Sequence, residues 1–114
     1  MDWKTIDAAI EDLSLLKHPF YQAWTAGALT KEDLKVYAKE YYHMERNFPR
    51  LVSRVHSNCA DPETRRLLVE NLADEELGAE NHRELWLRFA EGLGMSREEV
   101  VASEPSAKTR ASFE

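Results

Sequence analysis

The sequence lacks several features by which common protein classes are recognised. It has one cysteine, Cys59, which excludes an internal disulfide and a metal site made only of cysteines, and which fits a reducing compartment. No apolar run approaches the length that spans a membrane, and the residues after Met1 form no apolar signal core. We therefore expect a cytoplasmic protein that neither crosses nor binds a membrane.

Basic residues are also scarce. The chain of 114 residues has 21 Asp and Glu against 15 Lys and Arg, a net charge of −6, and no basic patch. This balance excludes nucleic acid as the main partner. Neither a period-two alternation nor an Asn-Gly or Asp-Gly hairpin signal occurs, so strands are not expected either. The sequence predicts an all-α fold.

The starts and ends of three helices can be placed in the first half. The apolar spacing predicts a helix over 3–16 with Asp2 as its N-cap, and a short helix that begins at Pro19 and ends at Gly27. A long helix is expected to begin after Thr30 and to end near residues 57–58. Pro49 lies inside it and removes one backbone hydrogen bond, so we expect a kink there.

The second half begins with what reads as another long helix, over 62–91, with Asp61 as N-cap and Pro62 at the first position. A short helix follows Ser96, and one more starts at Ser106. Eight residues of this stretch, from the helix to just after it, recur at steps of three and four and share one stripe. They are Leu68, Leu72, Glu75, Ala79, His82, Trp86, Phe89 and Leu93.

Glu75 and His82 are the polar members of this stripe, and burying such groups is costly unless they are paired or bound to metal. One interpretation is that partners from other helices satisfy them, or that they bond to each other. The other is that they bind a metal inside a helical bundle. Seven residues correspond to about 10.5 Å of rise, too far for one ion on a straight helix. Ligation by both therefore needs two metals, or a break between them, for which Gly78 is available.

Other candidates are weaker. Most aromatic residues of the first half, including Tyr21 and Tyr37, have the spacing of ordinary core residues. Cys59 precedes a helix N-terminus, but no general base is identified for it. Four acidic residues near the stripe are expected to be solvated charge: Asp74, Glu76, Glu80 and Glu84.

Two long helices with wide apolar stripes need more partners than the remaining short helices offer. Either residues 1–114 are a fragment, or a second copy completes the core. We therefore expect a homo-oligomer with an apolar interface.

Several blocks of the sequence, in order and spacing over nearly the whole chain, resemble the haem-oxygenase-like superfamily, which includes thiaminase II and pyrroloquinoline-quinone biosynthesis protein C. Within it they are most similar to the chlamydial protein associating with death domains and its bacterial relatives. The blocks are His18-Pro19-Phe20-Tyr21-Gln22-Ala23-Trp24, Gly27-Ala28-Leu29-Thr30, Tyr37-Ala38-Lys39-Glu40-Tyr41-Tyr42, Phe48-Pro49-Arg50, His56-Ser57-Asn58-Cys59, Asn71-Leu72-Ala73-Asp74-Glu75-Glu76, Asn81-His82 and Leu85-Trp86.

The resemblance implies a haem-oxygenase-like helical bundle with a dinuclear metal site, of iron or else manganese. It implies formation of para-aminobenzoate, a folate precursor, by oxidation of one of the protein's own tyrosines with dioxygen. Glu75 and His82 match two metal ligands of the family, Tyr21 matches the tyrosine that is consumed, and Tyr37 matches a second active-site tyrosine. The remaining ligands and an amino-donor lysine belong to the second half of the family's domain.

We therefore expect residues 1–114 to be the N-terminal half of a single domain with an incomplete metal site, inactive by itself. An enzyme of pyrroloquinoline-quinone or thiamine metabolism with the same fold is the first alternative. A non-catalytic helical interaction or dimerisation module is the second.

Overall fold

The computed structural model describes residues 2–114, which are helical without strands and divide into two compact units, Met1–Lys31 and Glu32–Glu114. The first unit contains α1 (Trp3–Asp12), the 3-10 turn η1 (Leu15–Lys17) and α2 (Pro19–Thr25). The second contains nearly all of α3 (Lys31–Asn58), then α4 (Pro62–Glu76), α5 (His82–Gly92), α6 (Arg97–Val101) and α7 (Ala107–Ala111). The predicted all-α class is confirmed.

Local capping explains where the helices of the first unit begin. The Asp2 carboxylate accepts a hydrogen bond from the Thr5 N–H at 2.8 Å, and the His18 Nδ1 atom accepts one from the Phe20 N–H at 3.1 Å. Gly27, with φ +69°, follows the end of α2 in a conformation that suits glycine. The predicted start of the first helix and the limits of the second are confirmed.

The predicted extent of the first helix to residue 16 is wrong. α1 ends at Asp12 because Ser14 takes ψ 128°, outside the helical region, and a separate 3-10 turn follows it. At this helix end the Glu11 carbonyl oxygen accepts hydrogen bonds from the Lys17 ammonium at 2.6 Å and from the Ser14 N–H at 3.5 Å. Apolar spacing continues past this end because it records which side chains share a face, not whether the backbone bonds persist.

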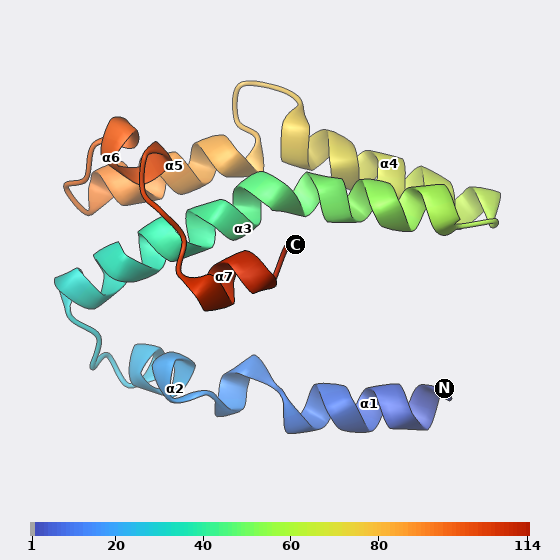
Figure 1. The fold of residues 1–114 in the computed structure, drawn as a ribbon, viewed down its shortest axis with the longest axis horizontal. Coiled ribbons are helices and arrows are strands. Elements are labelled where there is room, and N and C mark those ends of the chain that lie inside the picture. The colour runs from blue at the N-terminus through green and yellow to red at the C-terminus, as the bar shows by residue number, and fades with distance from the viewer. Residues whose placement is uncertain (1) are drawn as a thin grey trace. The chain divides into compact units, whose positions relative to one another are not determined.

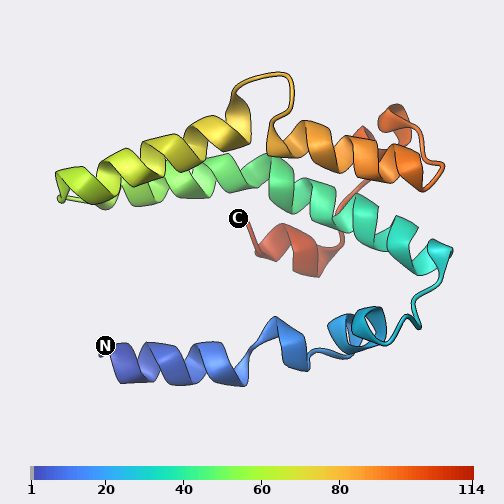
Figure 2. The same cartoon turned by 180° about the vertical axis from the view of Figure 1, so that it is seen from behind.

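In the second unit α3 is the element on which the others are assembled. Figures 1 and 2 show α4 beside one half of α3 and α5 beside the other half. In both views α3 changes direction within its length, as expected for a helix that contains Pro49, and it ends at Asn58 as predicted. The Glu40 carboxylate accepts hydrogen bonds from the Ser106 N–H and the Thr109 hydroxyl, which attach α7 to α3.

A small core joins α3, α5 and α6. Trp86 on α5 donates its indole N–H to the Ala38 carbonyl oxygen at 2.8 Å, which fixes the two helices together. Val100 on α6 is completely buried against them. The buried members of this core are Ala38, Tyr42, Leu87, Ala90, Met95 and Val100.

The long helix predicted over 62–91 is wrong, because α4 ends at Glu76 and α5 starts at His82. Leu77 is extended, and Gly78 has φ +80°, a left-handed conformation that other residues rarely adopt. Asn81 then caps α5 by accepting a hydrogen bond from the Glu84 N–H at 3.0 Å, and its side-chain amide donates one to the Gly78 carbonyl at 3.1 Å.

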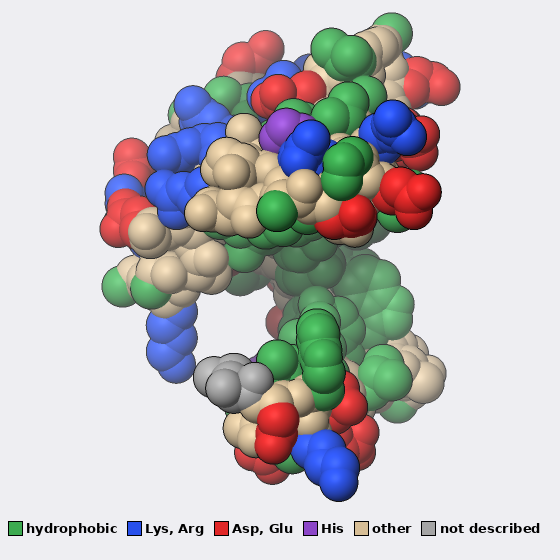
Figure 3. All heavy atoms as spheres, turned by 90° about the vertical axis from the view of Figure 1, so that its right-hand side faces the viewer, with side chains coloured by type: hydrophobic (Ala, Val, Ile, Leu, Met, Phe, Trp, Pro, Cys, Tyr) green, Lys and Arg blue, Asp and Glu red, His purple; other side chains and the backbone are tan. Residues whose placement is uncertain are grey.

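Large apolar side chains remain exposed in the first unit. Leu16, for example, is 80% exposed, and Figure 3 shows hydrophobic side chains (green) at the surface among charged ones. The homo-oligomer expected from such faces stays a prediction, as does the single-domain assignment. None of the helices in residues 2–114 has the length and apolar character needed to cross a bilayer.

Candidate metal centre

The break between α4 and α5 brings Glu75 and His82 into direct contact. Glu75 lies in the last turn of α4 and His82 is the first residue of α5. The His82 Nδ1 atom is 2.8 Å from the Glu75 Oε1 atom. A continuous helix would separate the two residues by about 10.5 Å along its axis. Gly78 is therefore the point at which the chain gives way so that these two side chains meet.

A third side chain, Glu45 of α3, joins them. One ligand atom from each of Glu45, Glu75 and His82 lies within 4.8 Å of the other two. Sequence reasoning missed Glu45. The signal that could have found it is its place on the face of α3 that carries the buried Ala38, Pro49 and Val52.

The two carboxylates are short of hydrogen-bond partners. Glu75 is only 6% exposed and Glu45 is half-buried, and the Oε2 atom of each is buried without a hydrogen-bond partner. Burial raises the pKa of the Glu45 carboxyl, and the nearby Glu75 charge raises it further. His82 and a hydrogen bond from the Tyr41 side chain act in the opposite direction on this pKa. Leaving a buried carboxylate oxygen without a partner is costly, so these two oxygens are suited to binding a cation.

The donor set fits a divalent transition metal. Carboxylate oxygen and imidazole nitrogen bind such ions at about 2.0–2.2 Å. Three donor atoms of one ion then lie about 3–4 Å apart, so donor atoms within 4.8 Å of one another need side-chain movements of about 1 Å to bind the same ion. His82 is 48% exposed, which leaves an open side. The bond between His82 and Glu75 fits both interpretations of the pair, and the two unpartnered oxygens favour the metal-binding one.

Aromatic rings adjoin this cluster. The Tyr37 ring lies 5.5 Å from the Trp86 ring between centroids, and the Tyr41 ring lies 4.6 Å from it. The Tyr41 side chain also bonds Glu45. The predicted Tyr37 is therefore linked to the cluster through the rings of Trp86 and Tyr41. Tyr21 lies on α2 in the first unit, with its ring edge-on to Phe20 at 5.2 Å. Its role at the site stays a prediction.

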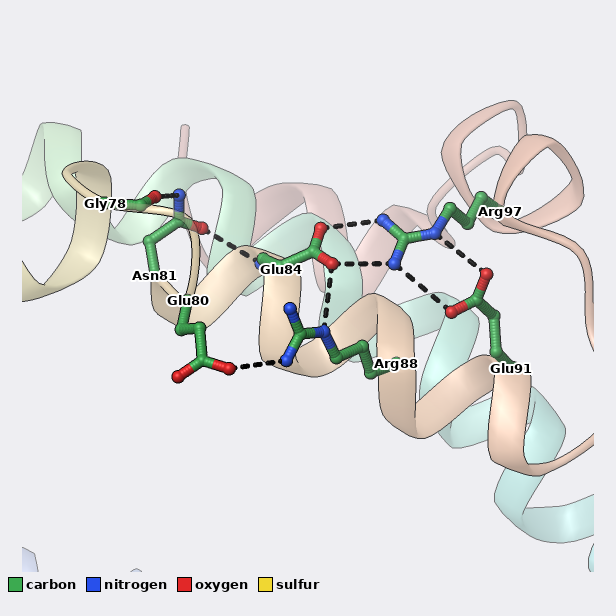
Figure 4. Close-up of polar contacts among 7 residues, drawn as sticks. All are labelled: Gly78, Glu80, Asn81, Glu84, Arg88, Glu91 and Arg97. Atoms are coloured by element: carbon green, nitrogen blue, oxygen red, sulfur yellow. Dashed lines mark hydrogen bonds and ion pairs between the residues drawn. The ribbon is translucent and has the colours of Figure 1, made fainter.

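A separate ion-pair network lies on the outer face of α5 (Figure 4). Arg97 of α6 donates two hydrogen bonds of 2.7 Å to the two carboxylate oxygens of Glu84, and Arg88 donates a third. Hydrogen bonds from Arg97, then from Arg88, lower the pKa of Glu84 to about 2. The prediction that Glu84 is merely solvated charge is wrong, because its side chain is 24% exposed and ties α6 to α5.

Several known proteins are similar to this chain in sequence. The chain is 49% identical to a 4-aminobenzoate synthase of Chlamydia muridarum over 106 residues, which are 93% of this chain and 45% of the relative. It is 41% identical to a 4-aminobenzoate synthase of Nitrosomonas europaea over 78% of this chain and 40% of the relative. A pyrroloquinoline-quinone synthase of Ectopseudomonas mendocina is 33% identical over 78% of this chain and 36% of the relative.

The chain thus spans less than half the length of these curated relatives. The family described as TENA/THI-4/PQQC matches residues 4–114, which is almost all of the sequence. On this match, and on the all-helical fold, the chain belongs to the TENA/THI-4/PQQC family.

Proposed function

We propose that this chain is part of a metal-dependent oxidase that uses dioxygen to form 4-aminobenzoate from one of its own tyrosines, Tyr21. The observation that carries the proposal is the convergence of Glu75 and His82 beside buried, unpartnered carboxylate oxygens. The names of the relatives that are 41–49% identical supply the product. Iron is the expected metal and manganese the second choice, in a dinuclear site as the family resemblance implies.

In this proposal Glu75 and His82 hold the metal, and further ligands and an amino-donor lysine come from the second half of the family's domain. A bound redox metal supplies the electrons with which dioxygen is reduced. The chain's own contribution is positioning. The loop at Gly78 sets Glu75 opposite His82, and the indole of Trp86 holds α5 on α3.

Tyr37 assists as a redox relay or positioning group. Its ring is 5.5 Å from both the Tyr41 and the Trp86 ring centroids. Tyr41 in turn bonds Glu45 next to Glu75. Such a row of closely spaced aromatic rings provides a short route for an electron between Tyr37 and the carboxylate cluster.

The test is rescue of a bacterial strain that cannot make 4-aminobenzoate by the longer enzyme of which this chain is proposed to be part. We expect rescue by the wild type and by Glu84→Ala, whose side chain lies in the outer network. We expect none by Glu75→Ala or His82→Ala. Tyr21→Phe should also fail to rescue, although the purified variant still binds metal.

Two alternatives have their own outcomes. Rescue of a pyrroloquinoline-quinone requirement in place of the 4-aminobenzoate requirement would favour the activity for which the 33% identical relative is named. No rescue of either, with the purified chain folded, would favour a non-catalytic interaction module with exposed apolar faces. Growth with Tyr21→Phe would refute the sacrificial role of Tyr21.

A further inference from the structure

We propose that Glu45 is a direct metal ligand, so that Glu45, Glu75 and His82 of this chain together form a three-ligand site for one divalent metal ion. The proposal rests on the metal site of the proposed function, but not on any oxidation of Tyr21. It assigns to α3 a ligand that neither the apolar stripe nor the family resemblance indicated.

The position of Glu45 fits a ligand that comes from another helix. It lies on α3, 30 residues before Glu75, yet its carboxylate reaches within 4.8 Å of the donor atoms of both other residues. Pro49, four residues later, cannot donate a backbone hydrogen bond to the Glu45 carbonyl. The helix therefore lacks one backbone hydrogen bond at the residue whose side chain enters the cluster.

The charges at the site call for a cation. Two carboxylates share a small, partly buried space, and the Oε2 atom of each has no hydrogen-bond partner. Among residues 2–114 no lysine or arginine forms an ion pair with either of them, and His82 bonds only Glu75. A divalent ion would neutralise both carboxylates, whereas a water molecule could only donate hydrogen bonds to their open oxygens and would leave both charges in place.

Tyr41 holds Glu45 in place for this role. Its side chain bonds the Glu45 carboxylate, which fixes the orientation of that group. Tyr41 is itself held by the Trp86 ring at 4.6 Å, and Trp86 is bonded to the backbone of α3. Locking a ligand by hydrogen bonds and packing is how proteins preorganise metal sites.

The test is a titration of the full 114-residue chain with Co²⁺ alone, followed by visible absorption, which reports both stoichiometry and coordination. We expect one ion per chain for the wild type. Glu45→Gln and Glu75→Gln should each weaken binding by at least about tenfold. Glu76→Gln is the matched control, because Glu76 is an exposed carboxylate next to Glu75, and it should bind Co²⁺ like the wild type.

Thermal melting separates ligation from a structural role. If Glu45 is a ligand, metal-free Glu45→Gln should melt at the wild-type temperature or above it, because a buried charge is removed. Co²⁺ should raise the melting temperature of the wild type but not that of Glu45→Gln. A lower melting temperature without metal, together with wild-type affinity, would assign Glu45 a structural role and overturn the proposal.

The remaining outcomes separate this proposal from the proposed function. If Glu45→Gln binds Co²⁺ like the wild type while Glu75→Gln and His82→Gln do not, Glu45 is not a ligand and the ligand pair of the proposed function stands. If the wild-type chain binds no Co²⁺, the three-ligand site is refuted, whereas the rescue experiment still decides the proposed function. If binding follows the expected pattern but rescue fails, the site is real and its chemistry is a different one.

Discussion

Replacing Gly78 with alanine should destabilise the protein, whereas the same replacement at Gly92 should stabilise it. A Cβ atom added at either position meets no heavy atom within 4 Å, so neither substitution causes a clash. The two sites differ in their backbone. Gly78 lies in the loop between α4 and α5 and has φ +80°. Gly92 is the last residue of α5, and its φ is not positive.

The magnitudes follow from this difference. An L-residue with a side chain pays about 1–2 kcal/mol in the left-handed region. Alanine also removes about 0.4–1 kcal/mol of conformational freedom from the unfolded chain, which favours folding. The balance for Gly78→Ala is a loss of about 0–1.6 kcal/mol, and for Gly92→Ala a gain of about 0.4–1 kcal/mol.

Urea denaturation of the two variants and the wild type measures these changes as shifts of the midpoint at constant slope. Gly78→Asn should lose less than Gly78→Ala, since asparagine tolerates the left-handed region better. Gly78→Ala should also weaken Co²⁺ binding more than Gly92→Ala, because only the loop at Gly78 sets Glu75 against His82. Stabilisation by Gly78→Ala equal to that by Gly92→Ala would refute the argument that this loop requires glycine.

Three further changes test the packing and the outer network. Val100→Ala should lower the free energy of unfolding by about 2 kcal/mol, because this side chain is 0% exposed. Val101→Ala is the control, and because Val101 is 44% exposed the loss should be under about 0.5 kcal/mol in the same urea denaturation. Trp86→Phe should cost about 1–2 kcal/mol, since it removes the 2.8 Å hydrogen bond to the carbonyl of α3, and the same denaturation measures it. Arg97 holds the pKa of Glu84 at about 2, so the stabilisation of the fold by the ionised Glu84 is complete above the ordinary pKa near 4.5 and is lost as the pH falls towards 2. Unfolding free energies measured against pH should therefore show a smaller loss at low pH for Glu84→Gln than for the wild type.

The starts of the helices could be predicted from sequence because capping is local. Asp61 accepts a hydrogen bond from the Thr64 N–H at 2.7 Å, and Ser96 accepts one from the Glu99 N–H at 3.1 Å, as the residue types at those spacings indicate. The two wrong helix limits, at Asp12 and Glu76, are both C-termini inside a continuing apolar pattern. Nothing in that pattern records the backbone turn at Ser14 or Leu77, so periodicity alone extended each helix too far.

Glu75 and His82 could be found from sequence because they interrupt an apolar stripe. This interruption is visible even though the single helix predicted over 62–91 is in fact two helices. Glu45 could not, because apolar residues occupy adjacent faces of α3 and the sequence alone does not indicate which face is covered. Val55 is in fact exposed, whereas Val52 is buried, so the covered face of α3 is rotated towards Glu45. Which of two adjacent apolar faces becomes covered depends on where α4 and α5 pack. A ligand that comes from another helix therefore becomes visible only once that packing is known.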